Sequence, residues 1–106
     1  MTFDVVVTPE AEFQIGSIHD WWTANRLAAP ALFVEELSAG LDLLARAPLV
    51  GRSYPHQIVR GVRRLLLRST RFHVYYQLTD KTVVVLAVWH ANRGAGPDLA
   101  TLTLSK

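Results

Sequence analysis

Hydrophobic and polar residues alternate over residues 71–78, and this period of two predicts a β-strand with one apolar and one polar face. The apolar face carries Phe72, Val74, Tyr76 and Leu78, and the polar face carries Arg71, His73, Tyr75 and Gln77. Polar residues 79–82 separate this strand from the β-branched run 83–89, and a break this short suits only a hairpin. Residues 62–68 alternate less regularly but lead through a Ser-Thr turn into the same strand. We therefore expect three antiparallel strands in a meander.

The N-terminal part of the chain predicts one further strand followed by a helix. Residues 3–7 are a short β-branched run that can join the later sheet. Thr8 suits the N-cap of a helix, and Pro9 suits the first helical position because its missing N–H costs nothing there. Two acidic residues then lie near the positive end of the helix dipole, and the helix should end near Asn25.

A second helix should open at Pro30 and end at Pro48, with one apolar stripe formed by Phe33, Leu37, Leu41 and Leu44. The order β-α-α-β-β-β predicts an α+β domain over residues 1–93, in which a helical hairpin packs on one face of a four-stranded, mainly antiparallel sheet. Residues 83–88 are apolar on both sides of their strand, so the second face of the sheet also needs a cover. That cover is either the C-terminal tail, residues 94–106, or a partner.

Composition narrows the classes of protein. A chain of 106 residues, half of them hydrophobic, suits one compact domain, and it carries neither a long apolar run nor a signal-peptide pattern, so we expect no membrane association and a cytoplasmic location. The absence of cysteine excludes disulfides, thiolate catalysis and cysteine-ligated zinc. The histidines, His19, His56, His73 and His90, lack metal-ligand spacing. We therefore expect no metal and no cofactor.

The net charge is only +2, but its distribution is uneven. Seven arginines and no acidic residue lie between positions 46 and 71, and arginine favours bidentate recognition of phosphate or carboxylate. This indicates a surface that binds an anionic partner, with Arg52, Arg63, Arg64, Arg68, Arg71 and Arg93 as its candidate cations and Tyr75 as a candidate contacting ring. The alternative is that these arginines only keep a small domain soluble.

Several short motifs, taken in order, resemble the toxins of type II toxin–antitoxin systems in the RelE/ParE superfamily. They lie at residues 8–11, 33–37, 47–52, 62–65, 72–78 and 83–93. The resemblance implies a small bacterial toxin that a cognate antitoxin holds inactive by covering its apolar grooves and basic surface. The antitoxin would then supply the missing cover of the sheet, and the residues we expect it to contact are Trp21, Trp22, Val85 and Trp89.

The superfamily contains two activities. ParE-like members inhibit DNA gyrase and need no catalytic acid or base, and the pattern around residues 51–52 and 62–64 is more similar to that branch, so gyrase inhibition and growth arrest are the favoured function. RelE-like members are metal-free, ribosome-dependent mRNA endoribonucleases. For that alternative the candidate residues are Arg64, Arg68 and Arg71 for charge stabilisation and His73 or His90 for proton transfer. A third possibility is a non-toxic basic module that binds nucleic acid, so whether the chain is an enzyme stays open at this point.

Overall fold

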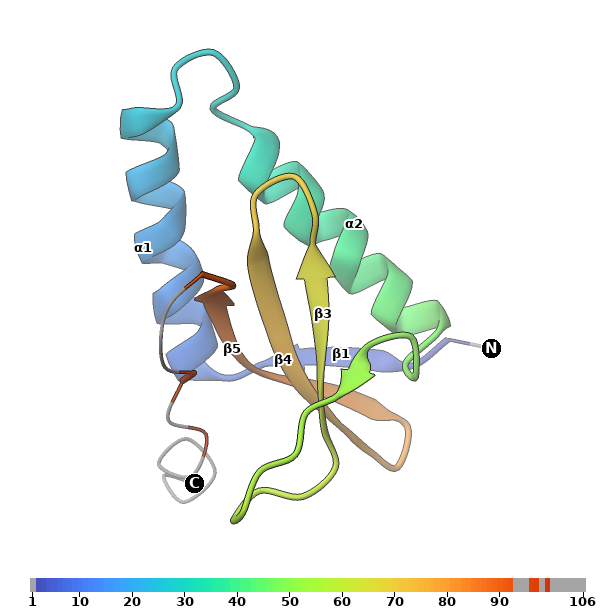
Figure 1. Cartoon of the computed structure of the whole chain (residues 1–106). Coiled ribbons are helices and arrows are strands. Elements are labelled where there is room, and N and C mark those ends of the chain that lie inside the picture. The colour runs from blue at the N-terminus through green and yellow to red at the C-terminus, as the bar shows by residue number, and fades with distance from the viewer. Residues whose placement is uncertain (1, 93–95, 98, 100–106) are drawn as a thin grey trace.

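The computed structural model describes residues 2–92, 96, 97 and 99, which form an α+β domain as predicted. The elements are β1 (Asp4–Val7), α1 (Pro9–Asn25), α2 (Leu32–Arg46), β2 (Arg52–Ser53), β3 (Val62–Leu67), β4 (Phe72–Thr79) and β5 (Thr82–His90). The strands form one sheet in the order β1-β5-β4-β3-β2, antiparallel except for the β1–β5 pair. Figure 1 shows α1 and α2 joined by a short connection and spreading apart away from it. No helix among the described residues is long and apolar enough to cross a membrane.

The sheet has five strands rather than the predicted four. The additional strand, β2, is only two residues long and pairs with β3 through Arg52 opposite Arg64 and Ser53 opposite Arg63. A two-residue strand has no measurable periodicity, and its neighbouring glycine and proline gave this segment the pattern of a loop. The missed strand matters because it places Arg52 beside the cations of β3.

Helix α1 begins where the capping residues predict. The Thr8 hydroxyl oxygen accepts a hydrogen bond from the Ala11 N–H at 3.2 Å, and the Thr8 N–H donates to the Val85 carbonyl at 3.1 Å, so the start of α1 is fastened to β5. Helix α2 begins at Leu32, later than the prediction from Pro30, and its N-cap residue makes no side-chain hydrogen bond. The α1–α2 connection is held by the Trp22 indole N–H, which donates to the Ala29 carbonyl at 2.8 Å.

The main core lies between the helices and the sheet. Its buried residues include Ala11, Trp22, Phe33, Leu37, Leu44, Leu67, Phe72, Val74, Tyr76, Val83, Val85 and Val88. Phe33 of α2 meets Phe72 of β4 edge to face, with ring centroids 5.3 Å apart. Each large apolar side chain that is fully removed from water contributes about 1.5–3 kcal/mol, so this layer is the main source of stability.

A β-bulge in β5 divides the apolar residues of that strand between the two faces of the sheet. Tyr75 lies opposite Ala87 and Tyr76 lies opposite Val85, which leaves Leu86 as the extra residue. Val83, Val85 and Val88 therefore face the helices, whereas Val84, Leu86, Ala87 and Trp89 face the other side. This explains why the strand is apolar on both sides without being sandwiched between two layers of helix.

The second face of the sheet carries a smaller core that the chain itself partly covers. Val59, from the connection between β2 and β3, and Leu99, from the tail, bury Tyr75, Leu86 and Ala87. One of the two predicted covers, the C-terminal tail, is thus present at Leu99. The rest of residues 94–106, apart from 96 and 97, lies outside the described residues.

Candidate partner-binding surfaces

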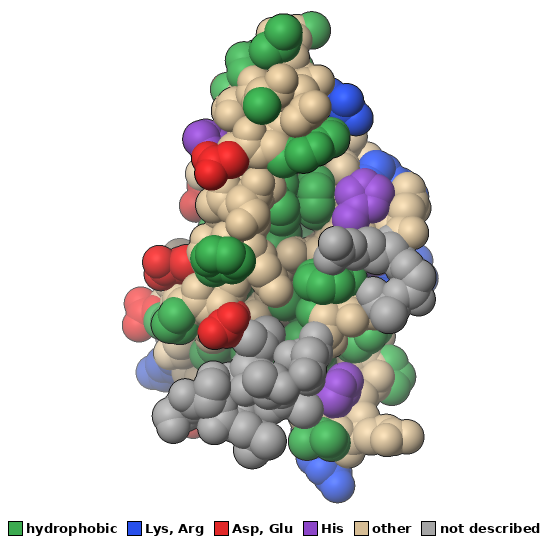
Figure 2. All heavy atoms as spheres, turned by 90° about the vertical axis from the view of Figure 1, so that its left-hand side faces the viewer, with side chains coloured by type: hydrophobic (Ala, Val, Ile, Leu, Met, Phe, Trp, Pro, Cys, Tyr) green, Lys and Arg blue, Asp and Glu red, His purple; other side chains and the backbone are tan. Residues whose placement is uncertain are grey.

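An apolar groove runs between α1 and the C-terminal half of β5. It has a volume of about 330 Å³ and is lined by Phe13, Gln14, Ser17, Ile18, Trp21, Phe72, Val88, Trp89 and His90. The groove exists because α1 has two apolar sides. Ile15 and Ile18 pack on the core, whereas Phe13 and Trp21 point outward and are 74% and 48% exposed. Figure 2 faces α1 and shows hydrophobic side chains in a hollow, with acidic side chains on one side and a histidine on the other.

The floor of the groove is the part of β5 that β1 does not reach. Strand β1 pairs with β5 only from Thr82 to Val85, and no other strand among the described residues lies along that side of β5. Beyond this point the Val88 N–H donates to the side-chain oxygen of Gln14 at 2.8 Å, so α1 takes over the role of a neighbouring strand there. An incompletely paired strand beside exposed apolar side chains is a common docking place for another protein.

The groove becomes cationic at the end next to the turn between β3 and β4. This end is lined by Trp21, Phe72 and His90, which also line the rest of the groove, and in addition by Arg26 and Arg71. The Arg26 guanidinium lies 4.9 Å from the Trp21 ring centroid and 5.6 Å from that of Trp22, distances typical of cation–π contacts. A partner that fits this surface needs apolar side chains in the middle and an acidic group at this end.

The turn that carries Arg71 is fastened to α2 by one carboxylate. Glu36 accepts hydrogen bonds from the Ser69 N–H at 2.8 Å, the Thr70 N–H at 2.9 Å and the Thr70 hydroxyl at 2.7 Å. Burial alone would raise the pKa of Glu36, but these hydrogen bonds outweigh it and leave the pKa below its ordinary value. Arg71 itself adopts a left-handed backbone conformation with φ of 67°, which closes the turn.

A second surface, the cationic hollow, lies at the β2–β3 edge of the sheet. It has a volume of about 390 Å³ and is lined by Val50, Gly51, Arg52, Arg64, Leu65, Leu66, Arg68 and His73. Arg52 lies opposite Arg64 across the β2–β3 pair, and His73 lies opposite Leu66 on β4. No acidic residue in the described part of the chain lines the hollow. Burial and the neighbouring guanidinium groups of Arg64 and Arg71 lower the pKa of His73, so this imidazole is neutral near pH 7.

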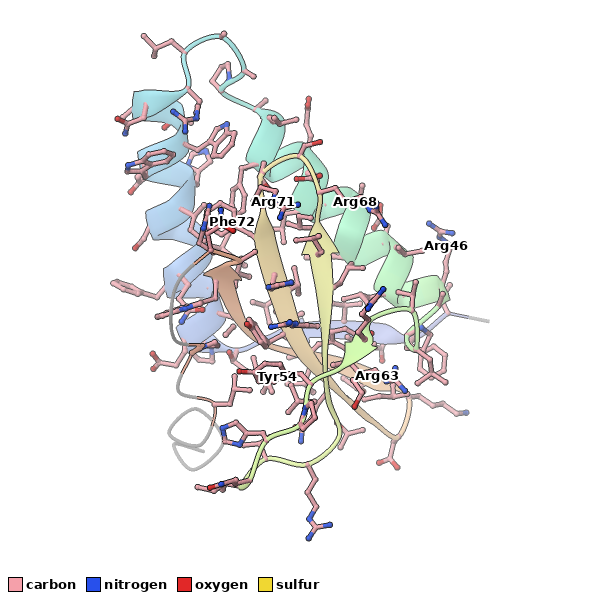
Figure 3. The ribbon with its side chains drawn as sticks, viewed as in Figure 1. Arg46, Tyr54, Arg63, Arg68, Arg71 and Phe72 are labelled. Atoms are coloured by element: carbon pink, nitrogen blue, oxygen red, sulfur yellow. The ribbon has the colours of Figure 1, made fainter. Side chains whose placement is uncertain are left out.

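The structure brings together some of the catalytic candidates and separates others. Arg64, Arg68 and His73 meet in the cationic hollow. His90 instead lies in the groove beside α1, where its ring contacts Phe72 with centroids 5.0 Å apart. The bulge at Leu86 sets this separation, because it decides which face His90 occupies. Arg71 lies between the two surfaces: it lowers the pKa of His73 and also lines the cationic end of the groove. Figure 3 shows Arg68 and Arg71 near the same turn.

Arg63 points away from the cationic hollow, toward the loop that follows α2. Its guanidinium donates to the carbonyls of Leu49 at 3.2 Å and Gly51 at 2.7 Å. The Tyr76 hydroxyl holds the same loop, since it donates to the Pro48 carbonyl at 2.7 Å and accepts from the Gly51 N–H at 2.9 Å. Arg63 is thus a structural residue, because successive side chains of a strand face opposite sides.

Burial corrects the predictions for Tyr75 and Val85 and limits that for Trp22. Tyr75 is only 3% exposed and packs edge to face on Tyr54, so it does not present a ring to a partner. Val85 lies in the main core at 0% exposure, so it does not form a docking surface. Trp22 also belongs to the core, at 7% exposure, and contributes only a small part of its ring to the cationic end of the groove. Trp21 and Trp89 both line the groove, although the Trp89 side chain also packs on the core of the second face. Their contact with an antitoxin stays a prediction. Arg93 lies outside the described residues.

Sequence reasoning missed Phe13 and Arg26 as parts of the groove. The signal was present, because Phe13, Ser17 and Trp21 recur every four residues and form a second stripe on α1, next to the stripe that faces the core.

The comparisons with known proteins agree with this architecture. The family model of the ParE toxin of type II toxin-antitoxin system, parDE, matches residues 5–94. A solved structure of the chromosomal ParDE TA system from P. aeruginosa has a TM-score of 0.70 at 19% sequence identity, and the match covers 85% of this chain and 97% of that chain. At this identity the likeness concerns the fold. Comparison with curated proteins gives no sequence match. Since the family model spans both helices and the whole sheet, the chain belongs to the ParE toxin family of type II toxin–antitoxin systems.

Proposed function

We propose that this protein is a toxin that arrests growth by inhibiting DNA gyrase and that a cognate antitoxin neutralises it. The family match over residues 5–94 is the observation that carries the proposal. Gyrase inhibition by contact needs no general acid or base, so it does not depend on the histidines, of which His90 lies on the opposite face of the sheet from Arg64 and Arg68 whereas His73 lies beside them. The protein acts in the cytoplasm, where gyrase works.

The antitoxin docks in the apolar groove between α1 and β5. Exposed apolar side chains next to charged groups are typical of protein–protein interfaces, and aromatic residues are the most frequent energetic anchors in them. Phe13 and Trp21 are the outward-facing aromatic anchors of α1. Arg26 and Arg71 at the end of the groove select a partner segment that places an acidic residue there.

Two reactions with the purified protein test the activity. DNA supercoiling by gyrase should stop when the protein is added and should resume when the antitoxin is present, whereas cell-free translation should continue. The opposite pattern, active gyrase with blocked translation and cleaved mRNA, would replace this proposal by the endoribonuclease alternative, with His73 as the proton-transfer group that lies beside Arg64.

Two variants test the docking surface. Phe13→Asp should weaken antitoxin binding by at least tenfold while toxicity persists, because truncation of a central aromatic anchor costs about 2 kcal/mol or more. Leu27→Asp is the matched control, since Leu27 is 79% exposed and does not line the groove. Equal effects of the two substitutions on antitoxin affinity, measured by calorimetry, would rule out this location.

A further inference from the structure

We propose that the cationic hollow binds the phosphodiester backbone of double-stranded nucleic acid, independently of sequence and of the contacts with gyrase or the antitoxin. The hollow brings three guanidinium groups, those of Arg52, Arg64 and Arg68, to one open surface. This activity does not depend on the proposed inhibition of gyrase.

The charge of the hollow is not compensated within the described part of the chain. Among the described residues, the ion pair present joins His19 and Asp20 of α1, which are far along the sequence from the arginines of the hollow. Glu36, the acidic residue fastened to the β3–β4 turn, is occupied by Ser69 and Thr70. Converging guanidinium groups without a carboxylate partner favour an external anion, and a planar guanidinium matches the oxygens of a phosphate in a bidentate manner.

The spacing of the cations suits a polyanion better than a single small anion. Arg64 and Arg68 are four residues apart along β3 and its end, which corresponds to about 13 Å of extended chain. Arg52 broadens the row sideways by one strand, a separation of about 4.8 Å. A duplex offers one negative charge for about every 1.7 Å of its axis, so a row of this length meets several phosphates without a fixed register.

The aromatic residues decide between a duplex and a single strand. Proteins that bind single strands without sequence preference stack the bases on exposed aromatic rings. Here Tyr75 is buried, and the Tyr54 ring is covered by the Arg64 guanidinium, which lies 5.0 Å from its centroid. The residues that line the hollow include no other aromatic ring except the His73 imidazole. The hollow can therefore contact the phosphate backbone of a nucleic acid but offers no ring on which bases could stack. Such contacts favour a duplex over a single strand, and they carry no direct sequence information.

Fluorescence anisotropy with the purified full chain and short labelled duplexes of two unrelated sequences tests the proposal. Neutral His73 leaves three cations near pH 7, so the slope of log affinity against log salt should be about −2.7, a loss of about 40-fold between about 50 and 200 mM salt. Arg68→Gln should reduce the slope to about −1.8 and the loss to about 12-fold, equally for both sequences.

Two further variants separate charge from folding. Arg46→Gln removes the same charge from the last residue of α2, which does not line the hollow, and should leave the slope unchanged. Arg64→Lys keeps the charge while weakening the contact with Tyr54, so its slope should stay near −2.7. Thermal unfolding verifies that each variant is folded.

Four results would overturn the proposal. These are an absence of binding at low salt, equal slopes for Arg68→Gln and Arg46→Gln, displacement of the duplex by polyglutamate at the same concentration of charge, and tighter binding of a single strand than of the duplex. The third result would assign the hollow to an acidic protein segment instead.

Discussion

Replacing Glu36 by glutamine should destabilise the fold, because this carboxylate connects α2 to the β3–β4 turn. One carboxylate oxygen accepts the Ser69 N–H and the other accepts both the N–H and the hydroxyl of Thr70. Glutamine keeps a single acceptor oxygen and turns the other position into a donor that faces a donor. At least one hydrogen bond to a charged group is lost, a contribution of about 1.5–3 kcal/mol each.

The partial exposure of the site lowers this figure. Glu36 is only partly buried and Ser69 is exposed, whereas Thr70 is 3% exposed and keeps little access to water. We expect a loss in the free energy of unfolding near the lower end, about 1.5 kcal/mol at pH 7. For a domain of this size that loss lowers the melting temperature by about 6–12 °C.

The dependence on pH is a second signature of the same contacts. The pKa of Glu36 is lowered from its ordinary value of 4.5, so its contribution is complete above about pH 4.5 and is lost as the pH falls through the lower pKa of the folded state. The difference in stability between the wild type and Glu36→Gln should therefore shrink in acid.

Urea unfolding followed by circular dichroism at pH 7 and pH 3 measures both effects. Glu35→Gln is the matched control, because Glu35 is the exposed neighbour in the same helix and makes no contact with the turn. If Glu36→Gln unfolds at the same urea concentration as Glu35→Gln, or if its deficit stays constant between the two pH values, the reasoning from the three hydrogen bonds is wrong.

Three other substitutions test the loop after α2 and the β3–β4 turn by thermal and urea unfolding. Gly51→Ala should cost about 1–3 kcal/mol, because a Cβ there would lie 2.5 Å from the Tyr76 hydroxyl oxygen and 2.9 Å from the Arg64 carbonyl oxygen; unchanged stability would show that the loop yields freely. Tyr76→Phe should cost about 1–3 kcal/mol, since it leaves the buried Pro48 carbonyl and Gly51 N–H without their partner, and a neutral result would contradict that accounting. Arg71→Gly should raise stability by up to about 1 kcal/mol, because glycine adopts a φ of 67° without strain. The larger loss of backbone entropy that glycine suffers on folding limits this gain. A decrease in stability would mean that contacts of the arginine outweigh the strain.

The local signals in the sequence predicted the elements well. The Thr8-Pro9 pair located the start of α1, and the alternation in residues 72–78 gave the two faces of β4, since both depend on neighbouring residues only. Such local patterns do not encode the choice between gyrase and the ribosome as the target.

The contents of the two surfaces were harder to predict. Residues 83–89 are apolar throughout, so their sequence holds no signal for the bulge at Leu86, and the face of His90 could not be derived. Tyr75 was assigned to the exposed face by alternation, but Val59 and Leu99 cover it from distant parts of the chain. The sequence named Arg64, Arg68, Arg71, His73 and His90 as candidates from their residue types alone. The β3–β4 register, which the structure supplies, is what selects Arg64, Arg68 and His73 as neighbours.

The extra residue in β5 fixes the parity of everything that follows it in the strand. Because side chains alternate with a period of two, regular pairing through Leu86, with no bulge, would turn the indole of Trp89 toward α1 and the imidazole of His90 toward the guanidinium groups of the opposite face. One bulge thus separates this arrangement, with His73 and His90 on opposite faces of the sheet, from one in which both imidazoles share a cationic surface. In this fold, one unpaired residue determines whether the cationic surface carries one imidazole beside its arginines or two.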